Sequence, residues 1–140
     1  MIQVEKQADG RYETTELIRT EEFGDQTKPP ILYEGYFYAQ YGTNHKRDGL
    51  TCMSMDGQIM WKTKRDPNFN KGSMILADDL LLATDGATTL YLIEPDPSGF
   101  RVVSETRVSL GTEQHWAHPV IYDGVLYVRH GRALIAYKVK

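Results

Sequence analysis

Residues 30–39 read PILYEGYFYA, residues 74–83 read MILADDLLLA, and residues 119–128 read PVIYDGVLYV. Each stretch is an apolar run, a two-residue acidic turn and a second apolar run. Pairs such as Asp-Gly are favoured in two-residue hairpin turns because both central residues need a positive φ. The turn residues Gly35, Asp79 and Gly124 are 44 and 45 residues apart (79 − 35 and 124 − 79). Asp also tolerates the left-handed conformation, so the sequence predicts one β-hairpin repeated three times.

A second strand unit follows each hairpin, at residues 50–55, 90–94 and 134–139. No window sustains apolar residues at helical spacing, and Gly and Pro interrupt the chain too often for a helix. A period of about 40–50 residues with four short strands is typical of a β-propeller blade. We therefore expect an all-β chain with about three four-stranded antiparallel sheets, as one partial propeller over residues 1–140. The expected blade parts are residues 1–24, 30–63, 74–110 and 119–140.

The apolar residues of these hairpins predict the core. Strands between two stacked sheets have both faces covered and lose polar alternation, as the run Leu80-Leu81-Leu82 does. Trp61 and Trp116 are interpreted as packing residues between blades, and Cys52 as a small buried hydrophobe. Nine residues are expected to be mostly buried: Ile31, Tyr36, Tyr38, Ile75, Leu80, Leu82, Val120, Leu126 and Val128.

The composition indicates a globular protein but does not identify a function. Hydrophobic residues make up 41% and charged residues 25% of the 140 residues, as in ordinary globular domains. The net charge of −3 does not favour nucleic acid as a partner. Cys52 is the single cysteine, so no intrachain disulfide forms. No apolar run has the length of a membrane span. Residues 1–6 are no signal peptide, so the compartment stays open, and a truncated exported or periplasmic protein is compatible with the sequence.

One stretch resembles a known repeat family. Residues 53–61 read MSMDGQIMW, which resembles the signature of PQQ-like repeats, where a strand ends in an acidic-Gly turn and the outer strand carries a Trp. Residues 119–128 resemble the first half of the same repeat. The resemblance covers almost the whole chain and implies a β-propeller. WD40 repeats are the near alternative, but no Trp-Asp dipeptide closes a blade here.

The resemblance implies two classes of function. The family includes quinoprotein dehydrogenases, outer-membrane assembly scaffolds and exported proteins. Its dehydrogenases resemble one another in a vicinal cysteine pair and a calcium site; this chain lacks the pair, and no calcium ligands can be mapped. We therefore favour a non-catalytic scaffold, or a propeller segment that binds a protein or small-molecule ligand, with no cofactor. The alternative is part of a quinoprotein-like dehydrogenase acting on alcohols or sugars, with PQQ and calcium.

Blade geometry separates the charged residues. In an antiparallel blade the turns within each hairpin lie at one end, and the B–C loops and D-to-A links lie at the opposite end. The turn end holds seven acidic residues: Asp9, Glu34, Asp56, Asp78, Asp79, Asp96 and Asp123. The link end holds the basic residues Lys28, Lys46, Arg47, Arg65, Lys71 and Arg132 and the four histidines. The candidate ligand-binding residues are His45, Arg47, His115, Trp116, His118 and His130.

A simpler interpretation competes with this site. Tight turns select Asp for backbone reasons, and longer loops collect every polar residue type, so we weigh a packing role above a binding role. His115 and His118 are not predicted to bind a metal, because no third ligand is near them in sequence.

The strand count also predicts association. The expected order is a C–D pair, two complete blades and an A–B–C unit. Closed propellers have about four to eight blades, so this chain is expected to be the C-terminal part of a longer propeller, or to join a second copy. Either way, we expect self-association through the open blade edges.

Overall fold

The computed structural model describes residues 1–25, 28–42, 47–65, 67–69, 71–112 and 115–139, which form strands, turns and links with no helix among them. The all-β prediction is confirmed. The N-terminal hairpin contains β1 (Ile2–Lys6) and β2 (Tyr12–Glu16). The first sheet contains β3 (Ile31–Tyr33), β4 (Tyr36–Gly42), β5 (Arg47–Ser54) and β6 (Ile59–Lys62).

Two further sheets follow along the chain. The second sheet contains β7 (Met74–Ala77), β8 (Leu80–Thr84), β9 (Thr89–Asp96) and β10 (Gly99–Arg107). The third sheet contains β11 (Val120–Tyr122), β12 (Val125–His130) and β13 (Ala133–Lys138). Each strand pairs antiparallel with its neighbour in sequence within its sheet. The strands therefore group as two, four, four and three, as the strand order in the sequence predicts.

The turns show why these sheets form where they do. Glu34 and Gly35 both have positive φ, at 47° and 80°, and so do Asp123 and Gly124, at 48° and 69°. The same holds for Asp78 and Asp79, the pair without glycine. These are the conformations of the tight hairpin turns that match strand twist. The local turn chemistry thus sets the register of all three inner hairpins.

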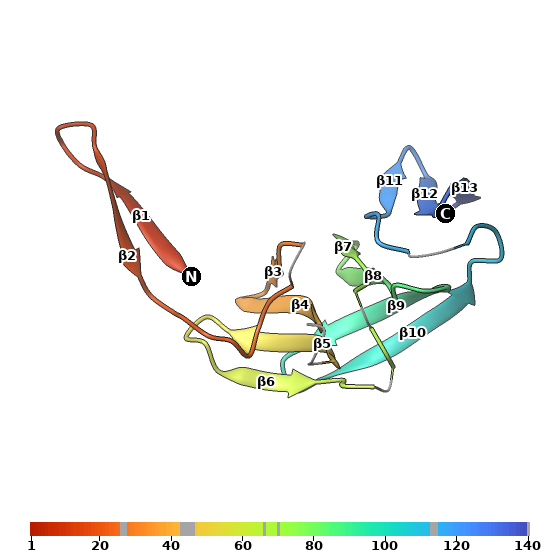
Figure 1. Cartoon of the computed structure of the whole chain (residues 1–140), viewed down its shortest axis with the longest axis horizontal. Coiled ribbons are helices and arrows are strands. Elements are labelled where there is room, and N and C mark those ends of the chain that lie inside the picture. The colour runs from red at the N-terminus through yellow and green to blue at the C-terminus, as the bar shows by residue number, and fades with distance from the viewer. Residues whose placement is uncertain (26–27, 43–46, 66, 70, 113–114, 140) are drawn as a thin grey trace.

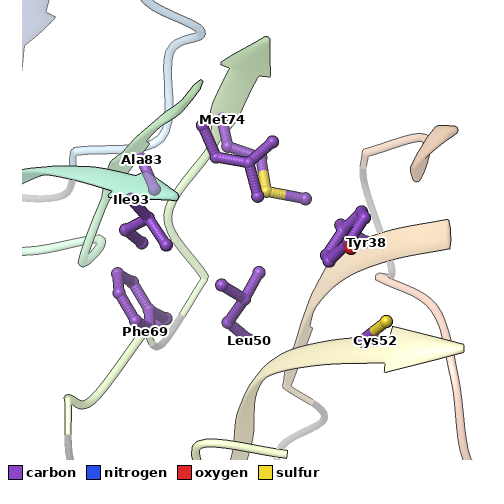
Figure 2. Packing of buried hydrophobic residues seen from close by; sticks show 8 residues of the cluster. Tyr38, Leu50, Cys52, Phe69, Met74, Ala83 and Ile93 are labelled. Atoms are coloured by element: carbon purple, nitrogen blue, oxygen red, sulfur yellow. The ribbon is translucent and has the colours of Figure 1, made fainter. Parts of the chain in front are cut away.

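Strand β8 of the second sheet is buried on both faces. Leu81 belongs to a core cluster between the first and second sheets, which Figure 2 shows from close by. Its neighbour Leu82 belongs to a second cluster, with Leu126 and Val128 of the third sheet. Successive residues of a strand point to opposite faces, so β8 supplies both cores. The predicted reason for the apolar run at residues 80–82 is therefore confirmed.

The predicted core is correct for some residues and wrong for one. Tyr38, Leu82, Leu126 and Val128 are buried. Four others are only half-buried: Ile31, Tyr36, Ile75 and Leu80. Val120 is 54% exposed. It pairs with Tyr127, which alternates with the buried Leu126 and Val128, so Val120 lies on the face of the third sheet that points away from the second.

The N-terminal hairpin stands apart from the stacked sheets. Figure 1 shows β1 and β2 projecting at one end of the molecule, with β11, β12 and β13 at the other end. The hairpin root is held to the first sheet: Phe23 packs on Phe37 with ring centroids 6.4 Å apart, and Glu22 pairs with Lys62 at 2.8 Å. The strands of the hairpin itself remain exposed along their whole length.

Candidate functional site

Two of the predicted site residues meet at the link end. The rings of His115 and His130 are stacked, with centroids 5.0 Å apart and an interplanar angle of 28°. Both side chains are buried. His130 ends β12, and its Nδ1 lies 2.9 Å from the Leu110 carbonyl oxygen. The described link residues therefore fold over the end of the third sheet.

Two glycines allow the link to approach this closely. Gly111 has a φ of 91°, and a Cβ built there would lie 2.3 Å from the His130 carbonyl oxygen. Gly131 has a φ of 58°, and a Cβ there would lie 2.0 Å from the Thr112 carbonyl oxygen. Both positions need the left-handed conformation and have no room for a side chain. The stacked pair thus rests on backbone contacts that a larger residue would break.

A hydrogen-bond network surrounds His115. Its amide donates to the Gly86 carbonyl at 3.1 Å, and its carbonyl accepts from Thr84 Oγ1 at 3.0 Å. Thr84 Oγ1 also accepts the Ser73 amide at 3.0 Å. Gln40 Nε2 donates to the Thr84 carbonyl at 2.8 Å, which joins the first sheet to the second. These groups hold the sheets and links together at the link end.

The electrostatics of the pair favour packing over ligand capture. Burial lowers the pKa of His115, and the neighbouring His130 lowers it further, against a smaller opposing effect of Asp85. Neither ring nitrogen of His115 has a hydrogen-bond partner among the described residues. A neutral, fully covered imidazole presents no charge to an anionic ligand. The expectation that His115 and His130 offer themselves to a ligand does not fit their burial.

Of the other four predicted residues, two have described side chains, and neither joins the pair. His45 lies outside the described residues, and Arg47 is the first residue of β5. Trp116 is 49% exposed, so its predicted packing role is wrong, because it lies on the outer side of the link while His115 turns inward. His118 is exposed and borders a cavity of only about 10 Å³, beside Gln40 and Ser73. Among the candidates whose side chains are described, Trp116 and His118 therefore lie apart from the buried His115–His130 pair.

Trp61 does pack between sheets. Its ring lies 5.3 Å from that of Phe100, and its Nε1 donates to the Asp96 carbonyl oxygen at 2.8 Å. Through this residue, the fourth strand of the first sheet covers the outer strands β9 and β10 of the second. Cys52 is buried as predicted, and burial raises the pKa of its thiol to about 11, which leaves it a poor nucleophile.

An apolar cleft beside the third sheet was not predicted from sequence. A cleft of about 400 Å³ lies between the second and third sheets. Its walls are mainly apolar, with polar residues at the rim on β10 and at the turn end. The lining residues include Leu82, Leu90, Leu92, Thr106, Leu126 and Val139. The cleft borders the outer part of β10. The first sheet has β6 as its fourth strand, and the third sheet has no described strand in the equivalent position.

The chain reaches this cleft at the end of β13, because Val139 directly after that strand lines it. β13 pairs with β12, and no other described strand pairs with it. The Val139 amide donates to the Gly124 carbonyl at 2.8 Å, on the β12 side. Because backbone groups alternate along an antiparallel strand, the amides of Leu134, Ala136 and Lys138 point to the free edge. The sequence predicts three strands in the third unit and four in each of the two units before it. This difference in strand count was the sequence signal that could have indicated the site.

Other kinds of site receive no support from the described residues. No group of three or more His, Cys, Asp or Glu side chains in the described part of the chain is arranged to hold a metal ion. Across the same residues, no helix has the length and apolar character needed to cross a membrane. Comparison of the chain with protein-family models and with curated proteins gives no match.

Proposed function

We propose that this chain is a β-propeller segment of the PQQ-like repeat type and acts as a non-catalytic scaffold that binds a protein partner. The binding site is the free edge of β13 together with the apolar cleft beside it. The observation that carries the proposal is the conjunction of the two: an unpaired strand edge next to a cleft of about 400 Å³. An added strand hydrogen-bonds to the edge and places alternate side chains over the cleft.

Contacts between equivalent positions support the propeller. Gln40 bonds to Thr84, and Ser73 Oγ bonds to the Ala117 carbonyl, each pair being 44 residues apart in sequence. This separation equals the spacing of Gly35 and Asp79 in the predicted repeat. Neighbouring repeat units stacked in the same orientation bring equivalent residues together in this way. Three antiparallel sheets in a row, with the middle one covered on both faces, agree with stacked blades.

The polar residues at the link end support a scaffold over an enzyme. Thr84 and Ser73 are buried and bonded to neighbouring links, and His115 stacks on His130. Groups held in such contacts fix the sheets relative to one another. They are not presented at a concave surface, as the groups of a catalytic site are.

A strand-binding experiment tests the proposal. We would titrate the ¹⁵N-labelled chain with a capped peptide of alternating Val and Glu and follow the backbone amide resonances. Saturable shifts are expected in β13 and in cleft residues such as Leu92 and Val139. A peptide of the same composition in scrambled order is the control. Shifts that do not saturate, or that fall mainly outside the cleft and β13, would contradict the proposed site.

A second arm addresses the dehydrogenase alternative. The same protein is mixed with pyrroloquinoline quinone and calcium, and the cofactor's absorbance is followed. The scaffold proposal expects no saturable change. Saturable binding that depends on calcium would overturn it in favour of a quinoprotein-like enzyme.

A further inference from the structure

The N-terminal hairpin forms a two-stranded sheet of its own among the described strands. Ile2, Val4 and Tyr12 are 60%, 56% and 65% exposed. β1 and β2 pair with each other, and no other described strand pairs with either. A lone two-stranded hairpin is marginally stable in water, and three or more strands with a covered apolar face are needed for stability. This hairpin is therefore built to gain stability from another surface.

The two faces of the hairpin differ. Val4 pairs with Thr14, and Lys6 pairs with Tyr12, so Ile2, Val4 and Tyr12 share one face. Lys6, Thr14 and Glu16 lie on the same face. The opposite face carries Gln3 and Glu5 with Glu13 and Thr15. All the large apolar side chains of the two strands are therefore on one face, which suits that face to cover a core while the other meets water.

The third sheet has the complementary gap. In the first sheet, β6 lies beyond β5 and brings Trp61 onto Phe100 of β10. In the third sheet, the corresponding place beyond β13 is unfilled by any described strand, and the cleft lies next to it. A strand added at β13 would set its inward side chains over Leu92 and Thr106, as β6 sets Trp61 over the other face of the same sheet.

Charge favours the hairpin as the occupant. Residues 2–16 contain four acidic and two basic residues, a net charge of −2. Residues 120–138 contain three basic residues and one acidic residue, a net charge of +2 with histidine neutral. Opposite charges favour this pairing, whereas two third sheets meeting each other would bring like charges together.

We propose that the hairpin of a second copy of this chain adds to the free edge of β13 and covers the cleft with Ile2, Val4 and Tyr12. The hairpin and the third sheet of one chain lie at opposite ends of the molecule (Figure 1), so the occupant comes from another copy. When each of two copies donates its hairpin to the other, the hairpin face and the β13 edge of both copies are covered. This exchange gives a closed two-fold pair. The inference rests on the proposed function, because it names the partner of the strand-accepting site.

Sedimentation of the full chain at micromolar concentration tests the inference. The wild type is expected to sediment at twice its 16.0 kDa mass. Val4→Glu, on the exposed hairpin face, and Ala136→Pro, at an outward-pointing amide, should each halve that mass. Proline is tolerated where the strand amide faces solvent, and circular dichroism would verify that both variants fold. Val103→Glu, at an exposed apolar residue of β10, is the matched control and should leave the mass unchanged.

Mixing the two variants sharpens the test. The Ala136→Pro chain keeps its hairpin, and the Val4→Glu chain keeps its edge, so an equimolar mixture should recover the doubled mass. Wild type that stays monomeric, or folded variants that both remain dimeric, would overturn the inference. A monomeric wild type that still binds the alternating Val and Glu peptide at β13 would leave the proposed function standing and refute only the second copy as partner.

Discussion

The second sheet meets a four-stranded neighbour on one face and a three-stranded neighbour on the other. On the first face, β6 extends past the core and Trp61 packs on Phe100. On the second face, the core of Leu82, Leu90 and Val128 gives way to a cleft of about 400 Å³ beside β13. The difference shows that the fourth strand is what closes the outer part of a sheet pair. Where the described chain places no such strand, the same packing leaves an apolar cleft.

The largest effect is expected at the closed interface. Leu81→Ala should lower the free energy of unfolding by about 2–5 kcal/mol, because it leaves a cavity at a fully buried position. Leu134→Ala, at an exposed residue of β13, should cost less than about 0.5 kcal/mol. Urea unfolding of both variants measures the contrast. Equal costs would show that burial is not distributed between the sheets as described.

The link over the third sheet should be the next most sensitive region. Gly131→Ala should destabilise the chain by about 1–3 kcal/mol through backbone strain, with a further cost from the contact with the Thr112 carbonyl. Gly10→Ala is the matched control, because Gly10 also has a positive φ but no atom lies within 4 Å of its Cβ position. Thermal unfolding should give the larger loss for Gly131. A similar loss for both glycines would contradict the close approach of the link.

The smallest effect is a pH dependence. The lowered pKa of His115 means that the unfolded chain binds a proton more readily than the folded chain. Stability is therefore full above the ordinary histidine pKa of 6.5 and falls as pH drops from there toward the lowered folded value. His115→Phe keeps the ring packing and should flatten this part of the stability curve. His118→Phe, at an exposed site, should not. Urea midpoints measured between neutral and mildly acidic pH compare the slopes, and equal slopes in the wild type and the His115 variant would refute the assignment.

Strand order was predictable because its causes are local. The turn pairs at residues 34–35, 78–79 and 123–124 adopt positive φ values, and all their residues except Glu34 are of types that tolerate this conformation. The run at residues 80–82 indicated a strand covered on both faces, and the two clusters confirm it. These features depend on a few neighbouring residues, so the sequence carries them directly.

The candidate site depended on longer-range geometry. The stacking of His115 on His130 requires the link to close over the end of β12, which Gly111 and Gly131 permit but their spacing in sequence does not indicate. Val120 belongs to an apolar run that looks like its buried counterparts, yet it faces away from the second sheet. The cleft lies where no described strand pairs with the outer edge of β13, and no single residue in the sequence indicates this gap.

Hydrogen–deuterium exchange of β13 as a function of protein concentration tests the central claim most directly. The amides of Leu134, Ala136 and Lys138 are expected to exchange quickly in dilute solution and to become protected as concentration rises. The β6 edge of the first sheet provides the internal comparison and should not change. Exchange at β13 that is independent of concentration, or an equal change at β6, would contradict the proposal that the outer edge of β13 accepts a strand.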